Sequence, residues 1–345
     1  MRLGCSYFGN RILRHVKTDL EFLRDNGFTY VVHTFSENDQ AFYKDQMAEI
    51  VALTRELGLE AHVDPWGVGR VFGGEAFSAF TSFYPECQQI ASDGRPTGGA
   101  CPNNPRFVEF MTRWTDDALA IGADVVFWDE PHFYLPSWQG GRPGTWGCRC
   151  AHCREKFLER FGEPMPEVET DRVVEFKKQC TVEFLVAQMR RVKQGGRRNS
   201  LCLFPTKHDA ENIRHWEQYV AMPELDNFGS DPYWAGAGHS PREFVGKYSR
   251  GVLDLCREYG KDHHIWIQGF KIPAGAEEDV RAAIHTAVEA GVEDLAVWGF
   301  DACRHISSIR CGDSDRVWAI VCEEFRRLQN RQPVRTGRAG EAAKR

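Results

Sequence analysis

Apolar and polar positions divide the chain into short hydrophobic runs and longer stretches with helical spacing. The runs are rich in β-branched and aromatic residues, and eight of them recur, at 2–8, 29–35, 59–66, 124–130, 200–207, 228–234, 264–270 and 294–300. Nearly continuous apolar strands separated by helices are typical of a parallel sheet covered by helices. Eight repeats predict an α/β fold closed into a (β/α)8 TIM barrel. No glycine-rich phosphate loop follows the first run, which argues against a dinucleotide-binding sheet.

Two of the helical stretches have recognisable ends. One is expected over Asp39–Leu57, ended by Gly58, and another over Pro105–Ile121, with Asn104 as N-cap and Gly122 as C-terminal stop. Apolar residues repeat at helical spacing in the second, so one wide face should pack on the sheet.

Two strand-to-helix connections are unusually long, at 67–104 after the third strand and 131–168 after the fourth. Long loops at this rim of a barrel usually carry function. We expect a single catalytic barrel over residues 1–330. Residues 331–345 hold five basic residues and one acid without apolar periodicity, which predicts a disordered basic tail.

Composition narrows the class of protein. The chain has 345 residues, 42% of them hydrophobic, and a net charge of −6, which gives no electrostatic reason to expect nucleic acid or an anionic membrane as partner. The N-terminus lacks the apolar run of a secretory signal, and no stretch approaches the roughly 18 apolar residues of a membrane span. These features predict a cytoplasmic protein and leave a homo-oligomer open. In such a chain the twelve cysteines indicate thiols and metal ligands more than disulfides.

Polar side chains beside aromatic ones follow almost every predicted strand. Barrel enzymes carry their chemistry at these strand ends, and carbohydrate sites combine rings that stack on sugar faces with groups that bind hydroxyls. Each residue alone could be structural, but their convergence on one rim is hard to explain by stability. The predicted substrate-binding residues are His33, Asp64, Trp66, His132, Lys207, Tyr233, Gln268, Lys271, Trp298 and Asp301.

The fourth strand, in DVVFWDEPHFY, ends in Asp129 and Glu130. Burial against an aromatic ring such as Trp128 would raise the pKa of Glu130 and keep it protonated as a general acid, while Asp129 stays ionised. Two carboxyls with separated pKa values are the working groups of glycosidic bond cleavage. We therefore predict a carbohydrate-cleaving hydrolase with Glu130 as general acid/base, assisted by Asp129, Asp231 or Asp64.

A cysteine cluster follows in WGCRCAHCREKF, where Cys148, Cys150 and Cys153 have the C-x-C-x-x-C spacing of a tetrahedral metal site. Cys101 is the expected fourth ligand, and Cys87 and His152 are the alternatives. A closed shell of thiolates predicts a structural zinc that joins the two long loops. An iron–sulfur cluster is the weaker alternative.

An upstream cysteine, a fourth-strand glutamate and a C-x-C-x-x-C run followed by Phe157 resemble the family 42 β-galactosidases over residues 101–161. That resemblance implies zinc bound by four cysteines beside the active site and Glu130 as proton donor. The chain departs from the family's pattern, because Asp129 replaces an asparagine and Gln268 stands where a nucleophilic glutamate is expected. Galactosidase activity is therefore not implied.

The adjacent Asp129 and Glu130 are also similar to the acid pair of N-acetylhexosaminidases of families 20 and 123. There the glutamate is the acid, and the preceding aspartate orients the substrate's 2-acetamido group as the internal nucleophile. The resemblance implies these roles for Asp129 and Glu130, with Tyr233 helping to hold the group. Such a mechanism needs no glutamate on the seventh strand.

Two other functions stay open. Five residues could instead bind a divalent cation in a sugar isomerase or epimerase: Asp64, Glu130, His132, His208 and Asp231. Gln268, in place of a nucleophile, is also compatible with a sugar-binding barrel that has lost catalysis. The hydrolase ranks first and the inactive binder last.

Overall fold

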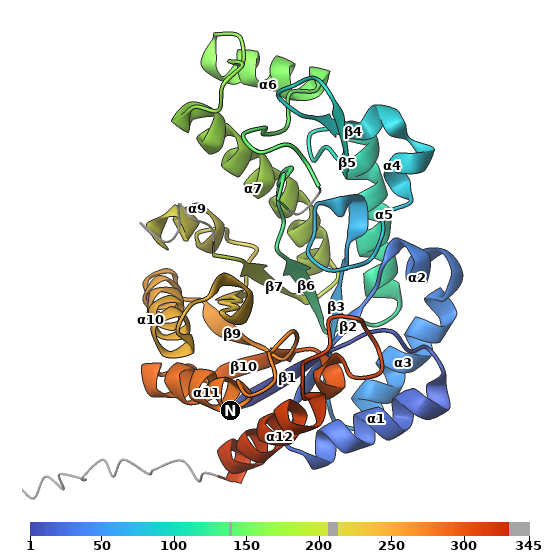
Figure 1. Cartoon of the computed structure of the whole chain (residues 1–345). Helices are drawn as coiled ribbons and strands as arrows, with labels where there is room; N and C mark the ends of the chain where they lie inside the picture. The colour runs from blue at the N-terminus through green and yellow to red at the C-terminus, as the bar shows by residue number, and fades with distance from the viewer. Residues whose placement is uncertain (138–139, 206–212, 331–345) are drawn as a thin grey trace, which may run out of the picture.

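A computed structural model describes residues 1–137, 140–205 and 213–330, and it contains a closed barrel of eight parallel strands (Figure 1). The strand order around the barrel is β1, β2, β3, β6, β7, β8, β9 and β10, with β10 paired to β1. Each strand overlaps a predicted apolar run, so the TIM barrel is confirmed. The strands are β1 (Arg2–Tyr7), β2 (Tyr30–Thr34), β3 (Glu60–Asp64), β6 (Val125–Asp129), β7 (Arg198–Leu203), β8 (Asn227–Ser230), β9 (Asp262–Gln268) and β10 (Asp294–Trp298).

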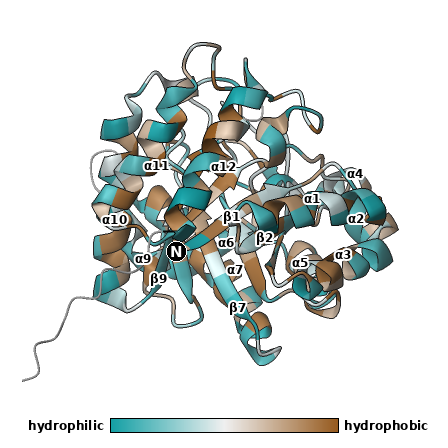
Figure 2. Cartoon of the chain, turned by 90° about the horizontal axis from the view of Figure 1, so that it is seen from below, coloured by the Kyte–Doolittle hydropathy of each residue, from teal (hydrophilic) through white to brown (hydrophobic). Residues whose placement is uncertain are grey.

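Helices surround the barrel, with apolar residues gathered toward the strands and hydrophilic residues on the outer surface (Figure 2). In α10, for example, Val245, Val252 and Leu255 are buried against the sheet. The principal helices are α1 (Leu13–Asp25), α2 (Glu37–Phe42), α3 (Lys44–Glu56), α5 (Pro105–Ala120), α7 (Asp171–Gln194), α10 (Pro241–Tyr259), α11 (Glu278–Ala290) and α12 (Ser314–Asn330). No helix in the described ranges is long and apolar enough to cross a membrane.

The two helices predicted with defined ends differ in outcome. Helix α5 matches, and the Asn104 side chain caps it by accepting from the Arg106 amide at 3.0 Å. The single helix expected from Asp39 is instead α2 and α3, which meet at Tyr43. The expected start was wrong because the helix begins earlier: Ser36 is the N-cap of α2, and Asp39 lies in its first turn and forms a capping box with Ser36.

The two long connections, 67–104 and 131–168, lie together above the barrel, at the top of Figure 1. We call this region the excursion. The first contains η1 (Val68–Arg70), α4 (Phe80–Phe83), η2 (Pro85–Cys87) and the antiparallel pair β4 (Gln88–Ile90) and β5 (Pro96–Ala100). The second contains α6 (Ala151–Phe161), a helix that the sequence pattern did not predict. Smaller elements elsewhere are η3 (Ile213–Trp216), α9 (Glu217–Val220), η4 (Ala235–Ala237) and η5 (Phe300–Cys303).

Charged side chains close the end of the barrel where the strands begin. Arg2 pairs with both Glu60 and Asp294, and the Tyr30 hydroxyl donates to Asp294 at 2.7 Å. This network fills the lower end of the barrel, so the open rim at the strands' C-terminal ends is the place for a site.

Candidate active site

Asp129 and Glu130 stand where β6 ends at this rim. Side chains alternate along a strand, so a continuing strand would turn Glu130 away from Asp129. Instead Glu130 has φ 43°, a left-handed conformation that non-glycine residues rarely adopt. Both carboxyls reach the same place, because a Cβ atom on Gly73 would lie 2.5 Å from Asp129 Oδ2 and 2.5 Å from Glu130 Oε2. Strained backbone of this kind is concentrated at functional sites.

Three more carboxyl groups complete what we term the acid cluster: Asp64 at the end of β3, Asp231 directly after β8, and Glu75 in the loop after β3. Burial, followed by the charges of neighbouring carboxyls, raises the pKa of Asp64, Asp129 and Glu130 well above its usual range. For Asp129 this is the opposite of the expectation that it stays ionised, because it is buried beside other carboxyls. Burial also raises the pKa of Glu75. Perturbed carboxyls gathered at a barrel rim are typical of an active site.

Glu130 and Asp231 form a hydrogen-bonded pair within this cluster. Burial raises the pKa of Asp231 to about 7. After burial, the charge and the hydrogen bond of Asp231 raise the pKa of Glu130, whereas the same bond lowers the pKa of Asp231. Glu130 is therefore the protonated partner and donates to Asp231, because two carboxyls in contact cannot both be ionised. The arrangement keeps a proton donor available near neutral pH.

Aromatic rings pack together beside the acid cluster. The ring centroid of Phe8 lies 5.2 Å from that of Trp66 and 5.7 Å from that of Trp298. Trp298 also contacts Trp266 at 5.6 Å and is only 6% exposed. Trp66 is half-buried, and its Nε1 donates to Glu75 Oε2 at 3.2 Å, which joins the rings to the acids. The carboxyl groups and the aromatic rings expected at the strand ends therefore lie together. We call this place, formed by the acid cluster with Phe8, Trp66 and Trp298, the mouth.

Three other predicted residues lie beside the cluster. Burial, followed by the charge of Asp231, raises the pKa of Tyr233 well above its usual range. The Nδ1 atom of His132 lies 2.6 Å from the carbonyl oxygen of Glu130, and burial lowers the pKa of His132 to about 4. Its ring is therefore neutral at neutral pH. The charge of Lys271 acts on Glu75 and lowers the pKa of that carboxyl.

His33 and Gln268, which were predicted to bind substrate, have hydrogen-bond partners elsewhere in the fold. His33 faces the helix layer, where its Nε2 lies 2.8 Å from Thr54 Oγ1 of α3, because strand alternation directs it out of the barrel. Gln268 Oε1 accepts from the Ala235 amide and its Nε2 donates to the Phe270 carbonyl, both at 3.0 Å. Gln268 thus fixes the loop that follows β8.

Asp301 lies in η5, where the charges of His305 and Arg304 act on it and no member of the acid cluster does. Lys207 lies outside the described residues, as does His208 of the alternative cation set.

The loop that covers Asp129 and Glu130 is fixed by one buried carboxylate. Glu37 Oε1 accepts from the Gly69 amide at 2.8 Å and from Ser78 Oγ at 2.6 Å. Its Oε2 accepts from the amides of Ala79 and Phe80 at 2.7 and 2.8 Å. These four bonds hold both ends of the segment that carries Gly73 and Glu75 over the acid pair.

A small pocket of about 130 Å³ opens at this loop. Its lining combines the loop with one predicted site residue: Gly67, Arg70, Phe72, Gly73, Gly74, Glu75, Ala76, Phe77 and His132. Phe77 is 91% exposed at its edge, so a large apolar side chain faces solvent beside the carboxyl groups.

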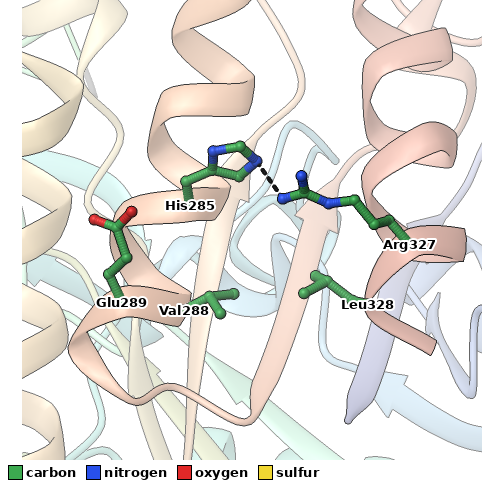
Figure 3. A pocket seen from close by; sticks show the side chains of 5 residues that line it. All are labelled: His285, Val288, Glu289, Arg327 and Leu328. Atoms are coloured by element: carbon green, nitrogen blue, oxygen red, sulfur yellow. Dashed lines mark hydrogen bonds between the residues drawn. The ribbon is translucent and has the colours of Figure 1, made fainter. Parts of the chain in front are cut away.

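A second depression, of about 240 Å³, lies between α11 and α12 (Figure 3). His285 Nε2 and Arg327 Nη2 are 2.7 Å apart there, and both side chains contact the buried carboxylate of Glu324 at 2.9 Å. Since α11 ends just before β10 begins, the depression is at the opposite end of the barrel from the acid cluster. His285, Arg327 and Glu324 are already paired with one another there, and the raised carboxyl pKa values lie at the other end, so we place the active site at the acid cluster.

The four predicted cysteines come together in the excursion. One sulfur from each of Cys101, Cys148, Cys150 and Cys153 lies within 4.8 Å of the others. Cys101 Sγ is 3.4 Å from Cys153 Sγ and 3.6 Å from Cys150 Sγ. These separations are too long for a disulfide, at about 2.05 Å, and near the roughly 3.8 Å that a tetrahedral zinc with Zn–S of about 2.3 Å requires. The residues present fit a metal ion.

Neither alternative ligand belongs to this group. Cys87 Sγ is 3.5 Å from Asn104 Oδ1, and His152 is also not part of the group of four. Cys101 follows β5, while the other three cysteines surround the start of α6, so an ion here would join the two long connections as predicted.

Gln89 connects this cluster with the acid pair. Its Nε2 donates to the carbonyl of Ala100, next to Cys101, at 2.9 Å. Its Oε1 accepts from the amide of Tyr134, four residues after Glu130, also at 2.9 Å. Gln89 is completely buried, so both contacts are shielded from water.

The cation set of the isomerase alternative does not converge in the described part of the chain. There, the four cysteines are the one group of three or more His, Cys, Asp or Glu residues whose ligand atoms lie within 4.8 Å of each other. Glu130 and Asp231 pair with each other, but no three of Asp64, Glu130, His132 and Asp231 have ligand atoms within 4.8 Å of one another.

Sequence reasoning missed Glu75, Gly73 and Cys202. Glu75 and Gly73 lie in a long loop without periodicity, where no pattern tells which residue turns inward. Cys202 lies beside Asp129 in the sheet, its carbonyl accepts from the Glu130 amide at 3.0 Å, and it also hydrogen-bonds with Asp231. Its inward position in β7 was the available signal.

No protein-family model matches the chain, and no curated protein sequence matches it. Solved structures do match. The catalytic domain of β-amylase from Paenibacillus polymyxa has a TM-score of 0.62 at 10% identity, over 94% of this chain and 98% of that one. The endo-β-1,4-mannanase from Thermotoga petrophila has a TM-score of 0.57 at 10% identity, over 96% and 76%.

A D-allulose 3-epimerase from Methylomonas sp. also matches, with a TM-score of 0.50 at 10% identity over 95% of this chain and 98% of that one. Similarity at 10% identity shows the fold alone. The fold that these neighbours share with the chain is the single-domain TIM barrel. The neighbours themselves are glycoside hydrolases and a sugar epimerase. They do not show membership of family 42.

Proposed function

We propose that the chain is a glycoside hydrolase with Glu130 as general acid/base. The observation that carries this proposal is the pair of Glu130 and Asp231, in which one buried carboxyl is kept protonated by the other. A general acid needs a raised pKa, and the burial of Glu130 together with the charge and hydrogen bond of Asp231 supplies it. Asp129, whose carboxyl lies against Gly73 together with that of Glu130, is the group that orients the substrate.

The aromatic rings support a carbohydrate substrate. Trp66 is half-buried and Phe77 is exposed, so both offer apolar faces beside groups that can bind hydroxyls. Trp298 is more enclosed and fixes the floor of the mouth through Phe8 and Trp266. The similarity to a β-amylase and a mannanase agrees with this substrate class.

We also propose that the four cysteines bind one structural zinc ion. Four protein thiolates leave no open position on a tetrahedral ion, so it would stabilise the excursion and take no part in the chemistry. Through Gln89, that order would extend to the segment after Glu130. A cytoplasmic location agrees with twelve reduced cysteines.

A panel of aryl glycosides tests the hydrolase. Release of the aryl group from at least one glycoside by the parental protein, and its loss in Glu130→Gln, is the expected result. Addition of a chelator followed by Mn²⁺ or Mg²⁺ separates the epimerase alternative, whose activity would depend on the added ion. Interconversion of free sugars without hydrolysis of any glycoside would contradict the proposal.

A further inference from the structure

Asp64 is the residue that the hydrolase mechanism leaves unexplained. Its side chain is 0% exposed, and neither carboxylate oxygen has a hydrogen-bond partner among the described residues. Asp231 Oδ1 and the Trp266 Nε1 group are also buried in the mouth without a partner in the described chain. Buried polar groups are nearly always hydrogen-bonded, so an unpaired carboxylate aimed into a mouth points to a ligand that donates to it.

The charges around Asp64 define that ligand further. The charges that act on the Asp64 carboxyl are those of Asp129, Glu130 and Glu75. Asp129 ends β6, Glu130 follows it, and Glu75 lies in the covering loop. Lys271 acts on Glu75. A neutral hydroxyl can donate to Asp64 but does not relieve the repulsion among these carboxyls, whereas a cation does both.

The chemistry of the mouth favours an organic cation over a metal ion. The acidic groups approach one another in pairs, and none of them joins a group of three within 4.8 Å in the described ranges. Trp66 follows Asp64 by two residues, packs on Phe8 and donates to Glu75. Carboxylates combined with aromatic faces recognise ammonium groups, which carry three hydrogen-bond donors.

We infer that the mouth binds a sugar bearing a protonated amine, with Asp64 as the residue that accepts from the ammonium group. The inference rests on the proposed function only in taking the ligand to be a sugar. It makes Asp64 a specificity-determining residue and leaves proton transfer to Glu130.

Calorimetry tests it with the methyl glycosides of glucosamine, galactosamine and mannosamine, each beside its 2-hydroxy and N-acetyl counterparts. The measurements are made at about pH 6, where an aliphatic amine is protonated. At least one amine should bind about tenfold or more tightly than both counterparts, the scale of a hydrogen bond to a charged group. Asp64→Asn should abolish that preference. Asp254→Asn, which removes the same charge from the exposed outer face of α10, should retain it.

Equal binding of amines and their counterparts would overturn the inference, as would a preference for the N-acetyl sugars or a preference that survives Asp64→Asn. Tight binding of Mn²⁺ that depends on Asp64, without an amine preference, would overturn it in favour of a metal ion. Hydrolysis is scored separately on aryl 2-amino and 2-hydroxy glycosides. Amine-selective binding without hydrolysis would contradict the hydrolase and leave this inference standing, and hydrolysis without amine preference would do the reverse.

Discussion

Asp129 and Glu130 are consecutive residues whose carboxyl groups meet at one point. Alternation along β6 would separate them, and the φ of 43° at Glu130 brings them together. The backbone of Gly73 lies against both, so that an added Cβ would be 2.5 Å from an oxygen of each. The acid pair is therefore held by one strained residue and one close glycine, both of which can be changed.

Gly73→Ala should impair catalysis more than folding. The new methyl group displaces the flexible ends of two side chains, and misplacement of reacting groups by about 1 Å can cost about 100-fold in rate. We expect kcat/KM to fall at least about tenfold while the melting temperature changes little. Gly236→Ala is the matched control, because no heavy atom would lie within 4 Å of its Cβ. Equal activity of the two variants would contradict the close approach.

Asp231→Asn should move the alkaline limb of the pH–rate profile to lower pH. The charge and hydrogen bond of Asp231 raise the pKa of Glu130, so their loss lowers that pKa, and the acid form disappears at lower pH. The profile of kcat/KM against pH measures this directly. An unmoved limb would exclude Glu130 as the group that titrates.

The same substitution changes how stability depends on pH. The pKa of Asp231 is about 7 in the folded protein and near 3.9 when unfolded, so its burial destabilises the fold increasingly as the pH rises between these values. Below about pH 4 the residue is protonated in both states. The free energy of unfolding of Asp231→Asn should therefore rise relative to the parental protein from about pH 4 to about 7. A constant difference across this window would contradict the assignment.

Glu37→Gln should loosen the covering loop. Glutamine keeps one acceptor oxygen, but its NH2 group cannot accept, so one pair of bonds is lost, either that from Gly69 and Ser78 or that from Ala79 and Phe80. Each such bond to a charged group contributes about 1.5–3 kcal/mol. Hydrogen exchange at these amides should accelerate, and kcat/KM should fall. Glu49→Gln, at an exposed position of α3, is the control. Unchanged protection in Glu37→Gln would show that the loop does not depend on this side chain.

Replacing Cys148 and Cys150 together by serine should remove the metal ion. Elemental analysis should find about one zinc per parental chain, as one tetrahedral site requires, and none in the double variant. The melting temperature should fall by at least about 5 °C, the scale of losing about 2 kcal/mol or more in a large domain. Cys87→Ser should keep its zinc. Full retention of zinc by the double variant would contradict the site.

The barrel was predictable because its signal is local and repeated. Each strand is an apolar run of the right length, and the parallel order follows from the helices between the runs. The cysteine group was predictable for the same reason, since three of its members are within six residues. Helix α6 was missed because the cysteine run and Gly162 mark a loop as readily as a helix.

The mouth could be predicted only in outline. Sequence position places Asp64, Asp129 and Asp231 at strand ends, but His33 faces α3 and Gln268 is occupied by backbone groups. Where these two side chains lie depends on which side of the sheet they face and on hydrogen-bond partners far away in the sequence. Glu75 depends on how a long loop folds back, which Glu37 determines from another connection.

The central claim is that Glu130 donates the proton to the leaving group, and the leaving-group dependence of Glu130→Gln tests it most directly. Rates are compared for two substrates with the same sugar, one with a poor leaving group and one that departs without protonation. The first should slow by about 10²–10⁴-fold and the second by much less. Asp129→Asn should slow both alike, because its role persists whatever leaves. Hydrolysis of both substrates by Glu130→Gln at the parental rate would contradict the assignment.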